Sequence, residues 1–386
     1  MPLEQSQDYS HILLNNAALL DVRAPVEFQQ GAFPNSTNCP LLNDDERHQV
    51  GLCYKTHGQQ QAIELGHQLV SGAIKQQRID NWLQQLQHQP NNYLYCYRGG
   101  LRSEISQQWL HAAGVDIVRV EGGYKAMRHF LSQQLQQADS RFDYILVGGL
   151  TGCRKTTLVA ELAQGIDLEA AAYHRGSSFG AHATAQNSQI DFEHILAIDL
   201  LRAAKASYPS IVLEDEGRFI GSVDIPKNIF EKMRSSPMVV IERSLDERIE
   251  QLLKEYVTDM LTEFTRLRTD QGHNADEDHA FKEFADYLLN SLQRISKRLG
   301  QQRWQALDHL MRAALLAHQK NDDLSQHRDW LRVLLTEYYD PMYLSQLEQR
   351  KDSIVLRGDY SECRDYIQHA NISSPICIDH SNRLGD

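Results

Sequence analysis

A short loop at residues 96–103, with the sequence CYRGGLRS, combines one cysteine with two arginines and two glycines. The apolar residues 93–95 before it are typical of a strand, and Ser103 is expected to cap the helix that follows. A glycine-rich turn entering a helix points backbone N–H groups inward, where the helix dipole also favours negative charge. Cys96 would therefore be a thiolate beside a bound anion, which suits nucleophilic attack by sulfur.

The remaining residues of this loop form its predicted anion site: Arg98, Gly99, Gly100, Arg102 and Ser103. The alternative is a structural cysteine buried at a strand end, as many cytosolic cysteines are. A buried cysteine of that kind needs neither the glycines nor the arginines, so the catalytic interpretation is favoured. The chain has six cysteines, and none shows the C-x-x-C spacing of a metal site, so the others are expected to be structural.

A second loop at residues 149–157, GLTGCRKTT, is close to the pattern G-x-x-x-x-G-K-[ST]. An apolar run at 144–147 precedes it and a helical stretch at 158–162 follows, which is the context that pattern requires. The backbone N–H groups and the lysine of such a loop hold a di- or triphosphate. The predicted phosphate-binding residues are Gly149, Thr151, Gly152, Lys155, Thr156 and Thr157.

Arg154 stands where the pattern has glycine. A side chain at a position with positive φ is strained, so this residue lowers the expectation of ordinary ATP turnover. Its charge could nevertheless help to hold a phosphate.

Two further segments are candidate parts of a site. The acidic residues Glu214, Asp215 and Glu216 follow a predicted strand, a position from which a carboxylate can bind Mg²⁺ directly or through water. The alternative for them is a solvated acidic turn. The run HRGSSFG at 174–180 is a predicted substrate loop, although an ordinary surface loop is the alternative. Its candidate residues are His174, Arg175 and Ser177.

Arg294, Lys297 and Arg298 have helical spacing and are expected to form one basic stripe that an RNA backbone could contact. Helices also carry such stripes for solubility, so both interpretations stay open. The aromatic cluster YYDPMY at 338–343 indicates packing or a helix stop.

The elements that must position these residues alternate between strands and helices, which predicts an α/β fold with parallel sheets. Strands are expected at 19–22, 93–95, 118–120, 144–147, 210–213 and 238–241. From 245 to 318, and again at 331–339, the spacing predicts helix. The expected regions are a first α/β domain at 1–135, a Gln-rich linker at 136–142, a phosphate-loop domain at 143–245 and a mainly helical region at 246–386.

Composition limits the classes of protein. With 386 residues the chain is long enough for two or three domains, and its net charge of −12 argues against general nucleic-acid binding without excluding a local basic face. No run approaches the roughly 18 apolar residues of a membrane helix, and the N-terminus has no secretory pattern. A cytoplasmic protein with reduced thiols is expected.

The first 135 residues resemble a rhodanese domain. The resemblance rests on DVR at 21–23, EF at 27–28, GAFP at 31–34 and NCP at 38–40, followed by the Cys96 loop. Rhodaneses carry sulfur, and sometimes selenium, on this cysteine as a persulfide or perselenide. Here Arg102 follows Cys96 by six positions, one more than in the common single-domain pattern. The longer loop resembles the C-x5-R loop of phosphatases and would suit a phosphate-sized anion.

A rhodanese-like domain followed by a phosphate loop resembles one family, the bacterial tRNA 2-selenouridine synthases. Further motifs carrying the resemblance lie at 43–47, 50–55, 121–126, 174–177, 213–216 and 337–343. The family has glycine at the position of Arg154. The resemblance implies that geranyl diphosphate first alkylates the sulfur of 2-thiouridine at the tRNA wobble position. Selenium from selenophosphate then replaces the geranylated sulfur.

In that reaction the resemblance implies no tightly bound cofactor, and a need for Mg²⁺ is left open. Lys155 would hold the diphosphate, and Cys96 would carry selenium as a perselenide while Arg98 and Arg102 hold the donor's phosphate. Two alternatives remain at this stage: an ATP-dependent tRNA sulfurtransferase that uses a Cys96 persulfide, and a C-x5-R phosphatase.

Overall fold

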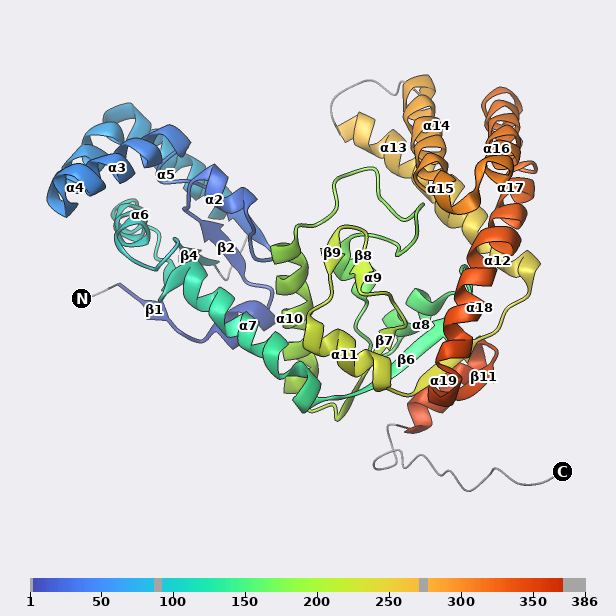
Figure 1. The fold of residues 1–386 in the computed structure, drawn as a ribbon. Helices are drawn as coiled ribbons and strands as arrows, with labels where there is room; N and C mark the ends of the chain where they lie inside the picture. Colours follow the sequence, from blue (N-terminus) through green and yellow to red (C-terminus); the bar gives the residue numbers. More distant parts are fainter. Residues whose placement is uncertain (1–2, 87–91, 271–276, 371–386) are drawn as a thin grey trace. The chain divides into compact units, whose positions relative to one another are not determined.

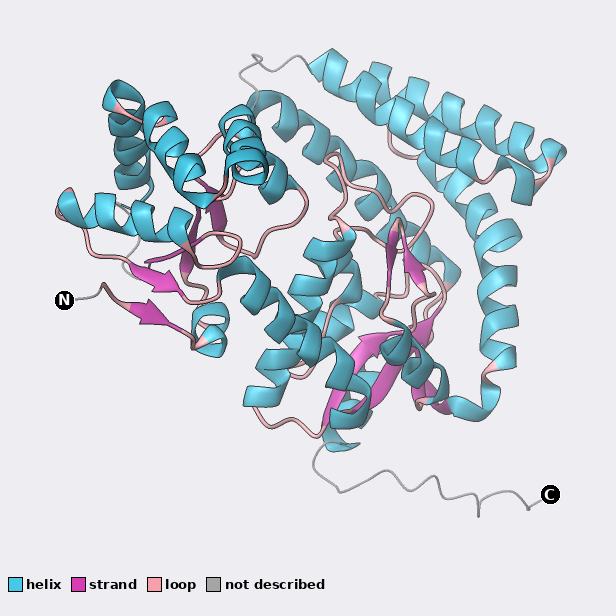
Figure 2. Cartoon of the chain, turned by 60° about the vertical axis from the view of Figure 1, so that its left-hand side comes forward, coloured by secondary structure: helices cyan, strands magenta, loops and turns pink. Residues whose placement is uncertain are grey.

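The computed structural model describes residues 3–86, 92–270 and 277–370. The first residues of the predicted region 1–135 and the last residues of the predicted region 246–386 therefore lie outside the described residues. The chain divides into two compact units. The first contains Met1–Gln137 and Ser188–Ala206, and the second contains Ala138–Asn187 and Ser207–Asp386. Figures 1 and 2 show strands and helices alternating along much of the chain and helices alone over most of its C-terminal part.

The first unit is built on a five-stranded sheet with the order β1-β5-β4-β2-β3, and every pair in it is parallel. The strands are β1 (Gln5–Ser6), β2 (Ala18–Asp21), β3 (Ser36–Asn38), β4 (Asn92–Tyr95) and β5 (Val118–Val120). Asp21 pairs with Tyr95 at the carboxyl ends of β2 and β4, so the segments that follow these strands leave from the same edge. That edge carries the Cys96 loop.

Among its described residues, eight helices belong to this unit: α1 (Tyr9–Leu14), α2 (Pro25–Gln29), α3 (Asp44–His57), α4 (Gln59–Leu69), α5 (Gly72–Leu86), α6 (Leu101–Ala112), α7 (Gly123–Arg141, whose last residues fall in the second unit) and α10 (Gln189–Lys205). The core between sheet and helices includes Leu20, Leu94 and Trp82. The Gln-rich stretch expected to be a linker is helical, because it continues α7 to Arg141.

Helix α10 comes from the middle of the sequence assigned to the phosphate-loop domain, yet it groups with the first unit. Its Asp191 accepts a hydrogen bond from the backbone N–H of Ala32 at 2.9 Å. Arg128 of α7 donates to Glu193 of α10 at 2.9 Å. The first unit therefore contains two separate stretches of chain.

The second unit has a parallel sheet with the order β11-β10-β6-β7. Its strands are β6 (Asp143–Gly149), β7 (Ser210–Glu214), β10 (Met238–Ile241) and β11 (Ile354–Gly358), beside a small antiparallel pair of β8 (Phe219–Ile220) and β9 (Val223–Asp224). Branched residues fill the central strands, and nearly all of β6 is buried, as parallel sheets covered on both faces require.

The helices of this unit are α8 (Lys155–Glu161), α9 (Leu168–Ala172), α11 (Lys227–Ser235), α12 (Leu245–Leu253), α13 (Asp259–Asp270), α14 (Glu277–Arg294), α15 (Ser296–Leu299), α16 (Gln301–Asn321), α17 (His327–Leu334), α18 (Asp340–Gln349) and α19 (Tyr360–Ala370). Two π-helical segments, η1 (Lys254–Thr258) and η2 (Leu335–Tyr339), continue α12 and α17, and η3 (Lys351–Ser353) is a short 3₁₀ helix. They confirm the α/β fold class and the mainly helical C-terminal part. Among the described helices, none has the length and apolar character to cross a membrane.

Two candidate anion-binding sites

Cys96 lies directly after β4 and is buried, with 3% of its surface exposed. Its thiol donates to the hydroxyl of Ser103 at 3.2 Å, and this hydroxyl donates to the carbonyl of Gly100 at 2.9 Å. The prediction that Ser103 caps the helix is wrong, because α6 begins at Leu101 and Gly100 is its cap. Ser103 instead lies within the first turn, where it contacts the sulfur.

The shape of the Cys96 loop is fixed by a second glycine turn. Gly99 has a φ of 64°, and a Cβ there would lie 2.6 Å from the backbone nitrogen of Gly122. The backbone N–H of Tyr124 donates to the carbonyl of Cys96 at 2.9 Å, and Arg119 donates to the carbonyl of Gly99 at 2.6 Å. Only glycine permits both this conformation and this close approach.

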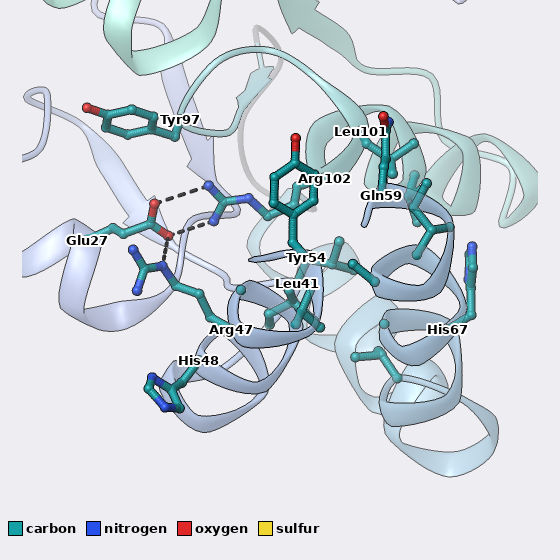
Figure 3. A pocket seen from close by; sticks show the side chains of 18 of the residues that line it. Glu27, Leu41, Arg47, His48, Tyr54, Gln59, His67, Tyr97, Leu101 and Arg102 are labelled. Atoms are coloured by element: carbon teal, nitrogen blue, oxygen red, sulfur yellow. Dashed lines mark hydrogen bonds and ion pairs between the residues drawn. The ribbon is translucent and has the colours of Figure 1, made fainter. Parts of the chain in front are cut away.

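Arg102 is held by a carboxylate from another element. Its two terminal nitrogens donate to Glu27 of α2 at 2.6 and 3.1 Å, and Arg47 of α3 lies 3.1 Å from the same carboxylate (Figure 3). Burial raises the pKa of Glu27, but the hydrogen bond and charge of Arg102 outweigh it and leave that pKa lowered. Arg98, by contrast, is exposed.

In the second unit, the phosphate loop joins the end of β6 to the start of α8. Arg154 caps this helix with φ 69° and ψ 36°, the left-handed conformation that its side chain makes costly. Its guanidinium lies 5.2 Å from the centre of the Tyr360 ring. The ammonium of Lys155 donates to the carbonyl of Gly149 at 3.2 Å. Arg154 therefore has the positive φ that the sequence analysis considered, while phosphate binding by the loop stays a prediction.

A cavity of about 280 Å³, lined by both polar and apolar side chains, lies over this loop. The predicted residues that line it are Thr151, Gly152, Lys155, Thr156, Thr157, Arg175, Ser177 and Glu216. Residues that the sequence reasoning missed also line it: Asp167, Glu169, Glu255, Tyr256 and Tyr343. Tyr343 lies in the aromatic cluster that was interpreted as packing, whereas no motif marks Glu169.

The cavity has mixed charge. Thr156 donates to Glu169 at 2.8 Å. Burial, reinforced by the charge of Glu216, raises the pKa of Glu169 to about 8. Burial, partly offset by Lys155, raises the pKa of Glu216 to about 7. Burial lowers the pKa of Lys155, but nearby acidic groups outweigh it and leave that pKa raised. A lysine cation therefore faces carboxyls that remain partly protonated near neutral pH, which leaves room for an anion.

The 174–180 loop is tied to the helical region. Arg175 donates to Glu263 of α13 at 2.5 Å, and Ser177 accepts from the Tyr256 hydroxyl at 2.7 Å. His174 does not line the cavity, and burial lowers its pKa to about 4. Arg175 and Ser177 are thus the members of this loop that the fold brings to the site.

Two of the three acidic residues after β7 have other partners. Glu214 is fully buried and accepts from the backbone N–H of Leu168 at 3.0 Å. Asp215 forms an ion pair with Arg350. Glu216 is the member that lines the cavity. Within the described ranges, no three His, Cys, Asp or Glu side chains come together in a way that could hold a metal ion.

The three residues of the predicted basic stripe lie on two helices rather than one, and all three are exposed. Helix α14 ends at Arg294, and α15 begins at Ser296 after Ile295 leaves helical geometry, with ψ at 1°. Arg294 donates to the carbonyl of Ser178 at 2.9 Å, so it supports the 174–180 loop. Lys297 and Arg298 are exposed on α15.

Comparisons with known proteins cover both units. Residues 142–373 match the family described as the tRNA 2-selenouridine synthase AAA domain, and residues 6–129 match the rhodanese-like domain. A tRNA 2-selenouridine synthase from Pseudomonas fluorescens is 48% identical over 368 residues, covering 95% of this chain and 99% of the relative. One from Cupriavidus necator is 48% identical, covering 94% and 96%. One from Hahella chejuensis is 47% identical, covering 97% of each.

Proposed function

This chain belongs to the tRNA 2-selenouridine synthase family, a family of tRNA-modifying transferases, and from that premise we propose that it converts 2-thiouridine at the tRNA wobble position to 2-selenouridine in two steps. In the first step geranyl diphosphate alkylates the thiocarbonyl sulfur. In the second, selenium from selenophosphate replaces the geranylated sulfur. The observation that supports the proposal is that the chain has two candidate anion sites, one containing the sulfur of Cys96 and the other containing Lys155.

The phosphate loop supports the first step. When the sulfur of 2-thiouridine attacks the geranyl carbon, the carbon–oxygen bond breaks and diphosphate leaves, while the nucleobase loses its N3 proton. Lys155 and the loop N–H groups would stabilise that leaving group without any nucleotide hydrolysis. The cavity of about 280 Å³ has the size and polarity for a diphosphate.

Magnesium fits the same cavity as a companion of the diphosphate. Mg²⁺ prefers oxygen ligands and is often held by one or two carboxylates together with substrate phosphates. Glu169 and Glu216 supply the carboxylates, and the Thr156 hydroxyl is a third oxygen donor. These residues would hold the ion, which would add positive charge beside the leaving group.

The Cys96 loop supports the second step, which balances without a change in oxidation state. The carbon–sulfur bond breaks, a carbon–selenium bond forms, and geranylthiol leaves with one proton. Selenophosphate gives up selenium as selenide and its phosphoryl group passes to water, while N3 of the product regains a proton. Storing selenium as a perselenide would instead require an oxidant for loading and a thiol for release.

We therefore assign Cys96 an attack on phosphorus. The thiolate forms a sulfur–phosphorus bond, the phosphorus–selenium bond breaks, and selenide is released beside the nucleobase. Water then cleaves the sulfur–phosphorus bond to give phosphate and the free cysteine. The C-x5-R length of the loop and the charges of Arg98 and Arg102 support a phosphate-sized donor at this position.

The surface that contacts tRNA is proposed to include Lys297 and Arg298, which are exposed. They follow Arg294, which donates to the carbonyl of Ser178 in the 174–180 loop. Phosphate contacts of this kind give salt-dependent affinity. Charge reversal at both residues should weaken tRNA binding and reduce its dependence on salt.

The decisive experiment is mass analysis of wobble nucleosides from 2-thiouridine-containing tRNA incubated with the protein, geranyl diphosphate and selenophosphate. We expect S-geranyl-2-thiouridine with the first donor alone and 2-selenouridine with both. If neither nucleoside forms, the proposal fails. Consumption of labelled ATP without a need for selenophosphate would instead support a sulfurtransferase.

A further inference from the structure

A large hollow lies beside the Cys96 loop in the first unit. It has a volume of about 830 Å³, within the range of about 300–1,000 Å³ that is typical of small-molecule sites. Helices α3 and α4, the start of α6 and the Cys96 loop surround it, and Figure 3 shows the side chains of these elements gathered around it. Arg98 and Arg102 belong to its wall, so it opens onto the proposed selenophosphate site.

The wall of this hollow is mostly apolar. Its deep part includes Leu41 and Val70, which are buried. Its outer part carries Leu52, Tyr54, Tyr97 and Leu101, which are 56%, 58%, 39% and 43% exposed. These are four of the ten large hydrophobic side chains that are exposed among the described residues. A cluster of exposed apolar side chains around a hollow indicates a binding site.

The same hollow concentrates positive charge on an acidic chain. Four cationic side chains and one carboxylate line it, although the whole sequence has a net charge of −12. Glu27 holds Arg47 and Arg102. No described residue forms an ion pair with Lys55 or Arg98, and both are exposed. Two cations are therefore available for phosphates at the entrance of an apolar site.

The cavity over the phosphate loop is smaller and more polar than this hollow. It has about 280 Å³, and threonines, carboxylates and the cations of the phosphate loop line most of it. A prenyl diphosphate would place its phosphates there, but after transfer the ten-carbon chain is attached to the nucleobase. That chain must be shielded from water when the nucleobase reaches Cys96.

We propose that the hollow beside Cys96 binds the geranyl chain of S-geranyl-2-thiouridine during the selenium step, an inference that rests on the proposed function. The chain lies against Leu52, Tyr54 and Leu101, and the nucleobase remains at the mouth of the Cys96 loop. Lys55 binds an anticodon phosphate beside it, and Arg98 remains with the selenophosphate. The geranyl group then leaves as part of geranylthiol, and until it leaves its binding positions the nucleobase.

The test compares two tRNA substrates with the native enzyme and selenophosphate. One carries S-geranyl-2-thiouridine and the other carries S-methyl-2-thiouridine, which has an alkylated sulfur but no chain. We expect KM to be at least about ten-fold lower for the geranyl substrate, with similar kcat values. Equal KM values would overturn the proposal, whereas the absence of selenouridine from both substrates would overturn the proposed function itself.

A variant pair checks the location. Leu52→Gln combined with Tyr54→Gln changes exposed side chains and should leave the fold intact. We expect the KM of this double variant for the geranyl substrate to rise about ten-fold, toward its KM for the methyl substrate. Its KM for the methyl substrate should not change. Ile74→Gln is the matched control, because Ile74 is 44% exposed and does not line the hollow. An equal effect of both variants, or no effect of the double variant, would contradict this binding site.

Discussion

The carboxylate of Glu27 accepts hydrogen bonds from both terminal nitrogens of Arg102, at 2.6 and 3.1 Å. The two residues are far apart in the sequence, and both are conspicuous there, one in the EF pair at 27–28 and the other at the end of the Cys96 loop. Their pairing fixes the arginine before any anion binds. The loop therefore has a rigid cation at its end and a more exposed one, Arg98, at its middle.

Glu27→Gln should destabilise the first unit by about 2 kcal/mol, because a buried, charge-assisted hydrogen-bonded pair loses its carboxylate. The lowered pKa of Glu27 means that its stabilisation is present above the usual carboxyl value of 4.5 and is lost as the pH falls below it. Chemical denaturation at several pH values measures both effects. The exposed Glu104→Gln is the control, and equal stability of the two variants would contradict the expectation.

Cys96→Ser should abolish selenium incorporation and leave geranylation intact, because the two steps use different anion sites. Nucleoside mass analysis with each donor separates the steps. Cys53→Ser, which alters a half-buried cysteine of α3, should retain both products. Loss of geranylation in Cys96→Ser would refute the assignment of the two steps to different anion sites.

Labelling the phosphorus or the selenium of selenophosphate shows which of these two atoms becomes bonded to Cys96. Rapid quenching of a reaction with phosphorus-labelled selenophosphate should leave label on Cys96, because the proposed intermediate is a sulfur–phosphorus bond. Selenium label on the cysteine, without phosphorus label, would instead support the perselenide.

Lys155→Ala should reduce kcat/KM for geranylation by at least about ten-fold, because the diphosphate loses a charge-assisted hydrogen bond. Selenation of tRNA that is already geranylated should change little. Lys205→Ala, at the end of α10, provides a lysine control outside both cavities. Unchanged geranylation in Lys155→Ala would contradict the proposal that Lys155 binds the diphosphate.

Arg154 offers a test of backbone strain. Glycine at this left-handed position removes a cost of about 1–2 kcal/mol, whereas alanine keeps that cost and loses the contact with Tyr360. Arg154→Gly should therefore be more stable than Arg154→Ala by about 1 kcal/mol in denaturant titration. Equal stability would show that the loop relaxes when the arginine is removed.

The raised pKa values of Glu169 and Glu216, about 8 and 7, predict a pH effect on phosphate binding. As the pH rises from about 6 to 9, both carboxyls ionise and repel an anion in the cavity. The affinity for inorganic diphosphate, measured by calorimetry without divalent metal, should fall over this range. Glu216→Gln should flatten the fall, and an identical profile for both proteins would exclude these groups as its cause.

The two loops could be predicted because each is one contiguous motif between a strand and a helix. Partners from distant elements could not. The sequence spacing does not predict the contact between Glu27 and Arg102 or the contact between Glu169 and Thr156, because each joins residues of two different helices that the fold brings together. Helical spacing likewise could not show that Arg294 ends its helix and donates to the carbonyl of Ser178, because that contact joins it to a distant loop.

Helix α10 has a consequence for synthesis on the ribosome. The first unit includes residues 188–206, so its chain is not complete when residue 137 emerges. The intervening segment, which contains the phosphate loop, is translated before Asp191 can meet Ala32. Assembly of the first unit in this form therefore requires residues 188–206 as well as residues 1–137. A truncation after residue 137 would leave a nascent rhodanese-like body without one of its helices.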